Sequence, residues 1–209
     1  MQPAERRKAP PSRAERTRAK ILTTAARQFN RHGYDGTSLR TISRATSMKA
    51  GSMYYHFTSK DELLREVIDL GVTVIHRAVL AAVEALPPRA GIRERIEVAI
   101  DTHLAVLLEY SDFTSASIRI YGQVPAAVRN RNKLVRRSYG DYWTSLLRQA
   151  QREGVLRDDR DPKLIRLLVI GMMNSTVEWF RPDRGSRRHV AELVKGMLFD
   201  GMLWRGKRR

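Results

Sequence analysis

Apolar residues recur along this chain at spacings of three and four, and no stretch alternates with the period of two that a strand requires. The first stripe ends at Gly33, and a later one stops at Pro87 and Pro88. The pattern predicts an all-α protein of about nine helices, with Asp161-Pro162 opening the eighth. The predicted ranges are 13–32, 38–45, 48–56, 60–85, 92–110, 113–121, 126–153, 162–181 and 186–204.

The segment 37–64 has the pattern of a helix-turn-helix followed by the start of a longer helix. Thr37 and Ser38 can cap the first short helix, whose predicted buried face is Leu39, Ile42 and Ala45. The second short helix has Met48, Gly51 and Tyr55 spaced for one face. Ser59 with Glu62 is a predicted capping box for the next helix. Two short helices joined in this way can enter the DNA major groove.

Positive charge is concentrated in the part of the chain that contains this motif. The 209 residues carry a formal net charge of +17, and residues 1–60 hold 13 Lys or Arg against 3 Asp or Glu. Residues 61–209 hold 26 against 19, an excess that an arginine-rich proteome alone would produce. The denser N-terminal excess favours a nucleic-acid partner. Residues 1–14 are basic and contain three prolines, which predicts a disordered arm that lies in the minor groove or is simply solvated.

The motif resembles the DNA-binding domain of the TetR family of bacterial transcriptional repressors. The matching residues are Phe29, Gly33-Tyr34, Thr37 to Ile42, Gly51 to Phe57 and Ser59 to Leu64. The match covers about the first quarter of the chain, and the remainder fits the family by length and helical pattern. The resemblance implies a disordered arm at 1–14, a DNA-binding domain at 15–60 and a ligand-binding and dimerisation domain at 61–205. It also implies a palindromic double-stranded DNA operator and repression as the usual mode.

Candidate DNA contacts divide into phosphate and base contacts. The phosphate candidates are donors near helix starts, namely Thr37, Ser38, Tyr54, Tyr55, His56 and Lys60. The base-reading candidates lie on the outer face of the motif, namely Arg40, Lys49, Ala50 and Ser52. The family commonly has Gly where Ser47 stands and a polar or basic residue where Ala50 stands, so its operator sequence does not transfer.

The remaining motif residues have structural interpretations. Met53 and Phe57 are predicted core residues, and one of Tyr54 and Tyr55 is expected to pack while the other faces phosphate. Gly51 is expected to permit close approach of a helix or a backbone.

The helices at 162–181 and 186–204 are the predicted homodimer interface. Both are strongly apolar, and Gly171, Gly196 and Gly201 would permit close helix packing. Part of each stripe must also close the core of the monomer. A dimer would present two motifs to two half-sites of an operator.

The resemblance implies a pocket for a small hydrophobic ligand among the later helices. The candidates, each of which is also a plausible core residue, are His103, Leu107, Phe113, Ile120, Tyr121, Tyr139, Trp143, Met173, Thr176, Val177 and Trp179. The ending Trp179-Phe180-Arg181-Pro182 resembles TetR regulators of fatty-acid and sterol catabolism, which sense acyl-CoA thioesters. Arg129, Arg131, Lys133, Arg136 and Arg137 would suit the phosphates of CoA or form a solvated helix face. A hydrophobic drug or metabolite is the alternative ligand.

Composition excludes several other classes. The chain has no cysteine, no apolar run near 18 residues and no secretory pattern, so we expect a cytoplasmic protein without a membrane span. We expect no cofactor and no metal. His103, Glu109 and Asp112 are the only hint of an enzyme, and no catalytic motif accompanies them. A constitutive DNA-binding protein and a regulator controlled by a protein partner stay open as alternatives.

Overall fold

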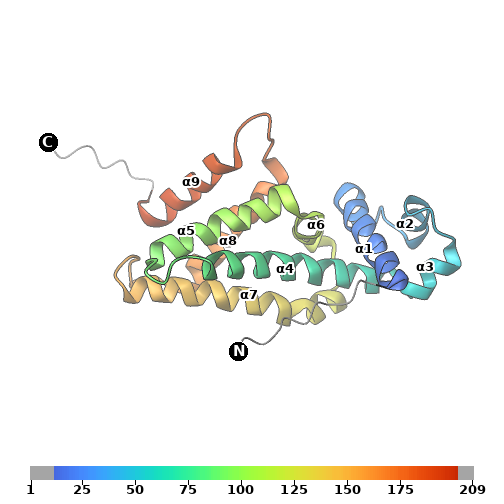
Figure 1. Ribbon diagram of the computed structural model, residues 1–209, viewed down its shortest axis with the longest axis horizontal. Helices are drawn as coiled ribbons and strands as arrows, with labels where there is room; N and C mark the ends of the chain where they lie inside the picture. Colours follow the sequence, from blue (N-terminus) through green and yellow to red (C-terminus); the bar gives the residue numbers. More distant parts are fainter. Residues whose placement is uncertain (1–11, 202–209) are drawn as a thin grey trace, which may run out of the picture.

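The computed structural model describes residues 12–201, apart from the side chain of Ala50, and every regular element in that range is helical (Figure 1). The all-α prediction is therefore confirmed. The α-helices are α1 (Arg13–His32), α2 (Leu39–Ala45), α3 (Ala50–His56), α4 (Lys60–Glu84), α5 (Ile92–Ala105), α6 (Asp112–Arg119), α7 (Ala126–Arg152), α8 (Pro162–Trp179) and α9 (Arg187–Phe199). A π-helical turn, Val106–Tyr110, extends α5, and a 3₁₀ turn, Tyr121–Gln123, follows α6.

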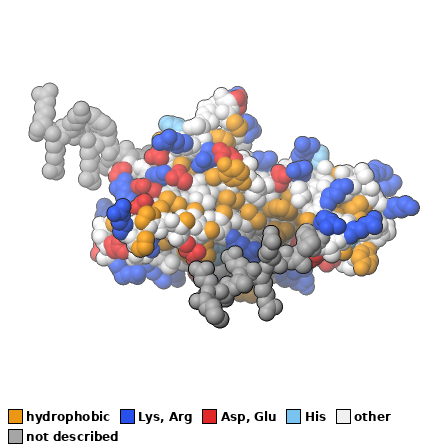
Figure 2. Space-filling model, in the orientation of Figure 1, with side chains coloured by type: hydrophobic (Ala, Val, Ile, Leu, Met, Phe, Trp, Pro, Cys, Tyr) orange, Lys and Arg blue, Asp and Glu red, His pale blue; other side chains and the backbone are white. Residues whose placement is uncertain are grey.

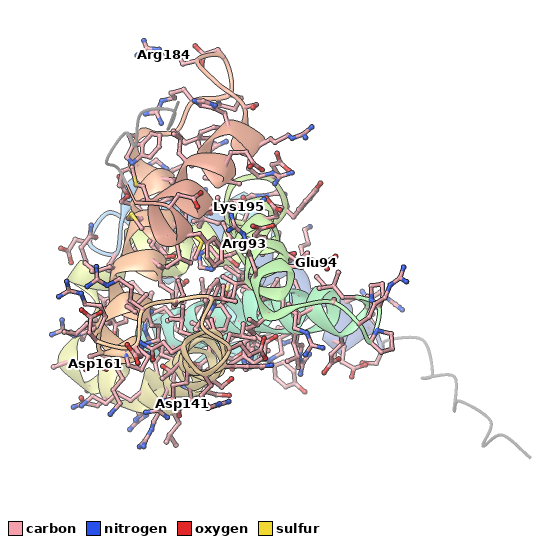
Figure 3. All side chains as sticks on the ribbon, turned by 90° about the vertical axis from the view of Figure 1, so that its left-hand side faces the viewer. Arg93, Glu94, Asp141, Asp161, Arg184 and Lys195 are labelled. Atoms are coloured by element: carbon pink, nitrogen blue, oxygen red, sulfur yellow. The ribbon has the colours of Figure 1, made fainter. Side chains whose placement is uncertain are left out.

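The three N-terminal helices, α1, α2 and α3, form one end of the molecule, and α4 runs from them along its length (Figure 1). Helix α4 packs against α5, α6 and α7, while α9 packs on α5 and α8 packs on α7. Arg93 of α5 and Lys195 of α9, labelled in Figure 3, lie at the contact between these two helices. There Lys195 binds the Asp101 carboxylate of α5 at 2.7 Å, and the Arg93 guanidinium stacks on the Phe199 ring.

The buried apolar side chains form two cores, and α4 belongs to both of them. The first core joins α1, α2 and α3 to Leu63, Leu64, Val67 and Ile68 at the start of α4. It also includes Ala116 and Ile120 from α6 and its C-terminal end. The second core begins at Val72 of α4 and unites α5, α7, α8 and α9. A displacement of α4 or α6 would therefore affect the packing of both cores.

Side-chain caps fix where several of the helices begin. Ser12 and Glu15 form a reciprocal capping box at α1, so Ser12, Arg13 and Ala14 cap and begin this helix. The predicted disordered arm, 1–14, overlapped the predicted helix 13–32 at Arg13 and Ala14, and there the helix prediction is the correct one. Ser12 is an ordered cap and not part of an arm, and residues 1–11 lie outside the described residues. Ser59 caps α4 by accepting from the Glu62 N–H, but the Glu62 carboxylate accepts from Thr58 instead of Ser59. The predicted capping box is thus only half present.

The buried faces of the two short motif helices differ from the prediction. In α2, Leu39 and Ile42 are buried as expected, but Ala45 is exposed and Ser43 is buried in its place. In α3, Gly51 and Tyr55 are exposed, and Met53 is the residue that enters the core. A helix of seven residues has too few apolar positions for spacing alone to determine its buried face.

Several helix boundaries also differ from the sequence prediction, most of them by one or two residues. The second motif helix begins at Ala50 instead of Met48, because Lys49 is its extended N-cap. The predicted helix 92–110 changes to π geometry after Ala105. The last helix ends at Phe199, and the part of its predicted range beyond Gly201 lies outside the described residues.

Candidate DNA-binding surface and ligand cavity

The turn between α2 and α3 is tight and held by side-chain hydrogen bonds. The Ser43 hydroxyl donates to the Met48 carbonyl at 2.7 Å, and the buried Thr46 hydroxyl lies 2.9 Å from the Ser43 carbonyl. Lys20 of α1 donates to the Thr46 carbonyl at 3.0 Å and so ties the turn to α1. Ser47 adopts a positive φ of 57°, which explains why the related family has glycine here.

The outer face of α2 and α3 is cationic and aromatic. Arg40, Arg44 and Lys49 are exposed, and within residues 12–201 none of them pairs with a carboxylate. Tyr54 and Tyr55 are 57% and 83% exposed. Figure 2 shows Lys and Arg side chains gathered over this end of the molecule. Cations without partners beside exposed phenols suit the phosphate backbone of DNA.

The structure separates the predicted DNA contacts into free and engaged groups. The expectation that one of Tyr54 and Tyr55 packs was wrong, because both rings are exposed. Thr37 is buried, and its hydroxyl donates to the Gly33 carbonyl at 2.8 Å. Ser38 is the α2 cap, which leaves its backbone at a helix start. Arg40, Lys49, Ser52, Tyr54 and Tyr55 are exposed, His56 is half-buried, and the side chain of Ala50 is not described.

Lys60 is held in place by Tyr34. Its ammonium lies 3.7 Å from the centroid of the Tyr34 ring and donates to the Tyr34 carbonyl at 3.0 Å. Burial, with a hydrogen bond from the phenol to Asp61, raises the pKa of Tyr34 to about 12, so the ring stays neutral beneath the lysine. These contacts position Lys60 at the start of α4. They also engage its ammonium in one cation–π contact and one hydrogen bond, so it has fewer donors left for phosphate.

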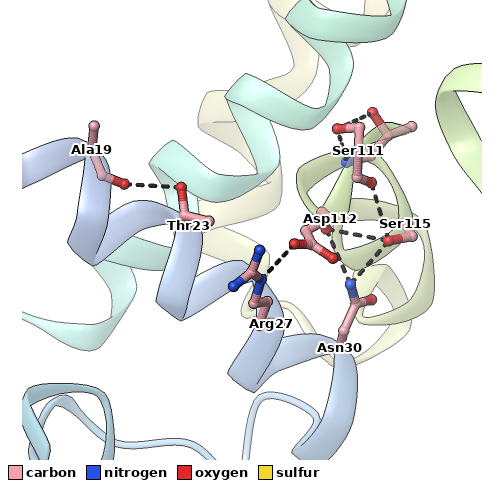
Figure 4. Close-up of polar contacts among 8 residues, drawn as sticks. Ala19, Thr23, Arg27, Asn30, Ser111, Asp112 and Ser115 are labelled. Atoms are coloured by element: carbon pink, nitrogen blue, oxygen red, sulfur yellow. Dashed lines mark hydrogen bonds and ion pairs between the residues drawn. The ribbon is translucent and has the colours of Figure 1, made fainter. Parts of the chain in front are cut away.

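Helix α6 is tied to α1 by polar contacts (Figure 4). The Arg27 guanidinium pairs with the Asp112 carboxylate at 2.7 Å, and the Asn30 amide donates to the Ser115 hydroxyl at 2.9 Å. On the other side of α6, Thr114 donates to the carbonyl of Gly71 in α4 at 3.0 Å. Helix α6 is thus a bridge between the DNA-binding end and α4.

A cavity of about 650 Å³ lies among α4, α5, α6, α7 and α8. Its buried wall combines Gly71, Val72 and Ile75 with five polar residues, namely His103, Thr114, Ser117, Tyr139 and Thr144. Its outer wall carries five cations, Lys133, Arg136, Arg137, Lys163 and Arg166. The volume is typical of a small-molecule site.

His103 is the centre of the buried polar wall. Its Nδ1 lies 2.8 Å from the Tyr139 hydroxyl and its Nε2 lies 3.1 Å from Asn174 Oδ1. Burial lowers the pKa of His103 to about 4, which the hydrogen bond with Asn174 partly offsets, so the imidazole is neutral near pH 7. Burial also raises the pKa of Tyr139. The inner wall is therefore polar and uncharged.

The outer wall, in contrast, has a surplus of positive charge. Four of its five cations have no carboxylate partner within residues 12–201, and the fifth, Arg137, lies 3.6 Å from Asp141. Burial lowers the pKa of Arg136, whose guanidinium stacks 3.9 Å from the centroid of the Tyr121 ring. Asp161, labelled with Asp141 in Figure 3, is engaged in capping α8.

Arg166 differs from the other cations in that its side chain packs against α7 at Gly140. A Cβ on Gly140 would lie 2.0 Å from Arg166 Nη1, so this glycine lets the guanidinium lie against α7. Arg166 Nε is buried and has no acceptor among the described residues. A buried guanidinium nitrogen without an acceptor is costly unless a ligand supplies one.

Only three of the predicted pocket residues, His103, Tyr121 and Tyr139, line this cavity. Leu107, Phe113, Ile120, Trp143, Met173, Thr176, Val177 and Trp179 do not line it, and Trp179 is exposed. Of the predicted phosphate-binding cations, Lys133, Arg136 and Arg137 line it, whereas Arg129 and Arg131 do not. Sequence reasoning missed Lys163, Arg166, Leu167, Ile170, Gly171 and Asn174, whose helical spacing marks one face of α8.

Comparison with known families decides the classification. A family model described as bacterial regulatory proteins, tetR family, matches residues 21–67. A model described as the tetracyclin repressor-like C-terminal domain matches residues 89–202, which is more than half of the chain. The chain belongs to the TetR family. It is a helix-turn-helix, DNA-binding transcriptional regulator, and the family is not one of enzymes.

Individual relatives of this TetR-family protein match over most of its length. The transcriptional repressor KstR2 of Mycobacterium tuberculosis is 29% identical over 196 residues, which is 88% of this chain and 94% of KstR2. A crystal structure of AibR in complex with isovaleryl coenzyme A and operator DNA is 26% identical, with a TM-score of 0.79. It covers 88% of this chain and 98% of AibR. PfmR from Thermus thermophilus is 25% identical, with a TM-score of 0.76, over 88% of this chain and 99% of PfmR.

Between residues 12 and 201, no helix has the length and apolar character needed to cross a membrane. The same residues contain no group of three His, Asp or Glu side chains arranged to hold a metal ion.

Proposed function

We propose that this TetR-family regulator is a homodimeric repressor that leaves a palindromic operator when an acyl-CoA thioester occupies the cavity. The observation that carries the ligand assignment is the combination of a buried inner wall with an outer wall of five cations, four of which have no carboxylate partner within residues 12–201. Phosphates of CoA would pair with the cations, while the acyl group would enter the buried part.

The relatives support both parts of this proposal. KstR2 is named a repressor, and AibR was crystallised with isovaleryl coenzyme A and operator DNA. An apolar drug or metabolite is a poorer fit, because it would leave the buried Arg166 Nε and the other cations of the outer wall without counter-charges. A regulator without any ligand would not need a cavity of about 650 Å³ in its helical domain.

The DNA part of the proposal rests on the exposed face of α2 and α3. Tyr54, Tyr55 and Ser38 would contact phosphates, while Arg40, Lys49 and Ser52 would face base edges. Lys60 would reach phosphate from the start of α4, steadied by Tyr34. We assign no DNA contact to the Thr37 hydroxyl, because it is buried on the Gly33 carbonyl.

Coupling would pass through α4 and α6, which line the cavity and enter the core of the DNA-binding end. A ligand that displaces them would change the separation of the two motifs, which must match one DNA turn of about 34–36 Å. Linkage requires that operator DNA weaken ligand binding by the same factor.

The test is binding of the purified protein to its own upstream intergenic DNA, at fixed salt, with and without CoA thioesters of several chain lengths. We expect specific binding that a thioester weakens at least tenfold. Specific binding that no CoA thioester changes would reject the ligand assignment and favour a constitutive or partner-controlled regulator. A thioester that strengthens operator binding would reject release as the mechanism.

A matched pair of arginine variants tests the role of the cationic wall. Arg166→Ala should weaken binding of a CoA thioester on the order of tenfold, because a charge-assisted pair is lost. Arg148→Ala removes an exposed arginine of α7 that does not line the cavity, and should leave that affinity unchanged. Equal affinities of the two variants, measured by isothermal titration calorimetry, would contradict the phosphate-binding role.

A further inference from the structure

The buried end of the cavity contains a connected set of neutral hydrogen-bonding groups. His103 from α5 links the Tyr139 hydroxyl of α7 to the Asn174 amide of α8, with contacts of 2.8 and 3.1 Å. All three residues line the cavity, and His103 is 1% exposed. A wall built only to hold an alkyl chain would not need these groups.

The contacts allow two directions for the hydrogen bonds in this set, which depend on the tautomer of His103 and the orientation of the Asn174 amide. Asn174 Oδ1 faces His103 Nε2, so the neutral imidazole donates there and its Nδ1 accepts from the Tyr139 hydroxyl. That arrangement leaves the Asn174 Nδ2 amide hydrogens without an acceptor among residues 12–201. Rotation of the amide, with the other histidine tautomer, would instead free the Tyr139 hydroxyl to donate. Either arrangement leaves a donor at the cavity wall.

The neighbouring hydroxyls do not supply the missing acceptor among the described residues. Thr114 donates to the Gly71 carbonyl, Ser117 to the Thr114 carbonyl and Thr144 to the Gly140 carbonyl. No hydrogen bond joins any of these three to the His103 set within the described residues. Their oxygens keep lone pairs that can accept from a ligand hydroxyl, while the Asn174 amide can donate to a hydroxyl or carbonyl oxygen.

We infer that Asn174, held by His103 and Tyr139, binds an oxygen on the acyl part of the ligand, so that the effector is a hydroxy- or keto-acyl thioester. This inference rests on the proposed function, because the CoA phosphates on the outer wall direct the acyl group inward. An unsubstituted chain would bury the amide without a partner, which disfavours it on the order of tenfold.

The experiment compares ligands that differ only in that oxygen. Octanoyl-CoA is titrated into the full-length protein beside octanoyl-CoA derivatives that carry a hydroxyl or a ketone at carbon 3, 5 or 7. We expect at least one derivative to bind about tenfold more tightly than octanoyl-CoA. Octanoyl-CoA binding as tightly as all of its derivatives would overturn the inference.

Two variants with matched controls locate the effect. Asn174→Leu and Tyr139→Phe should reduce the preference for the oxygenated thioester to about twofold or less. The controls make the same changes outside the cavity, and they are Asn130→Leu and Tyr142→Phe. Asn130 is exposed on α7, and Tyr142 is half-buried near Tyr139. Both controls should keep the wild-type preference. A preference that survives in both Asn174→Leu and Tyr139→Phe would also overturn the inference.

A second arm separates this inference from the proposed function. The same acyl groups are titrated as N-acetylcysteamine thioesters, which carry the thioester but no phosphate. A preference for the oxygenated acyl group that is lost in Asn174→Leu would support the inference in this arm as well. If, in addition, the CoA thioesters bound no more tightly than the N-acetylcysteamine thioesters, CoA would be rejected as part of the ligand. No binding of any thioester in either arm would overturn both.

Discussion

Ser47 is the only residue other than glycine between positions 12 and 201 that adopts a positive φ. The left-handed region costs an L-residue roughly 1–2 kcal/mol, and glycine avoids that cost but loses about 0.5–1 kcal/mol through the entropy of the unfolded chain. We therefore expect Ser47→Gly to raise the free energy of unfolding by up to about 1 kcal/mol. Thermal and urea denaturation measure the change. A lower denaturation midpoint for Ser47→Gly would mean that the Ser47 side chain stabilises the turn by a contact that outweighs the cost of its backbone conformation.

The buried imidazole of His103 predicts a specific loss of stability in acid. The pKa of His103 is about 4 in the folded protein, against an ordinary value of 6.5, so the unfolded state binds more protons between these values. Its stabilising contribution is complete above about pH 6.5 and is lost as the pH falls towards 4, by up to about 3 kcal/mol.

Urea denaturation at several pH values measures this effect against the variant His103→Gln, which cannot ionise. The free energy of unfolding should fall less steeply for the variant between pH 6.5 and 4. His76, whose pKa burial also lowers, titrates in both proteins and supplies a common background. Parallel curves for the two proteins would show that His103 gains protons as readily in the folded state as in the unfolded one.

Long periodic elements could be predicted from the sequence, whereas the cavity could not. Helix α1 spans Arg13–His32 as the apolar stripe predicts, and Met53 and Phe57 enter the core. The faces of the seven-residue motif helices were misassigned at Ala45 and Tyr55, because short helices carry little periodicity. The π turn at Val106–Tyr110 keeps an apolar pattern that is compatible with an α-helix.

The cavity depends on contacts between distant helices, so its residues were only partly predicted. Large aromatic residues such as Trp143 were chosen as ligand contacts, yet Trp143 is fully buried in the second core. Arg166 was not chosen, since its role depends on Gly140 of α7, which is 26 positions earlier in the chain. A single sequence does not reveal which glycine makes room for which side chain.

At the scale of elements, the contact between α4 and α6 depends on Gly71. A Cβ at this position would lie 2.4 Å from the Phe113 carbonyl oxygen and 2.7 Å from the Ser117 side chain. Gly71→Ala should therefore destabilise the protein by about 1–3 kcal/mol, because a backbone carbonyl cannot move aside without shifting α6.

Gly51→Ala is the matched control for this prediction. Gly51 is also helical, and its Cβ would meet nothing within 4 Å. Its free energy of unfolding should rise by up to about 1 kcal/mol, as expected for an exposed helical glycine. If Gly71→Ala proved as stable as Gly51→Ala, α6 would not be tightly fixed to α4.

At the scale of the molecule, α8 and α9 present an apolar face that the other residues between positions 12 and 201 leave uncovered. Leu164, Leu167, Leu168, Leu193 and Met197 are exposed. A Cβ atom at Gly171 or Gly196 would meet no atom of residues 12–201 within 4 Å, so the close helix packing predicted at these glycines does not occur within the described part of one protomer. A second copy placed across a two-fold axis would cover this face and position two motifs for two half-sites.

Leu168→Glu tests that arrangement. Leu168 is 69% exposed in the single chain, so the substitution disturbs little of the protomer's core, but it would place two carboxylates in an apolar interface. We expect monomers in light scattering and a fall in operator affinity on the order of a hundredfold or more, because two linked contacts become independent. Leu134→Glu, at a position of α7 that is 77% exposed, is the matched control and should stay dimeric and bind the operator normally. If Leu168→Glu stayed dimeric with unchanged operator affinity, the dimer would have to form through another surface, and the separation of its motifs would no longer depend on α8 and α9.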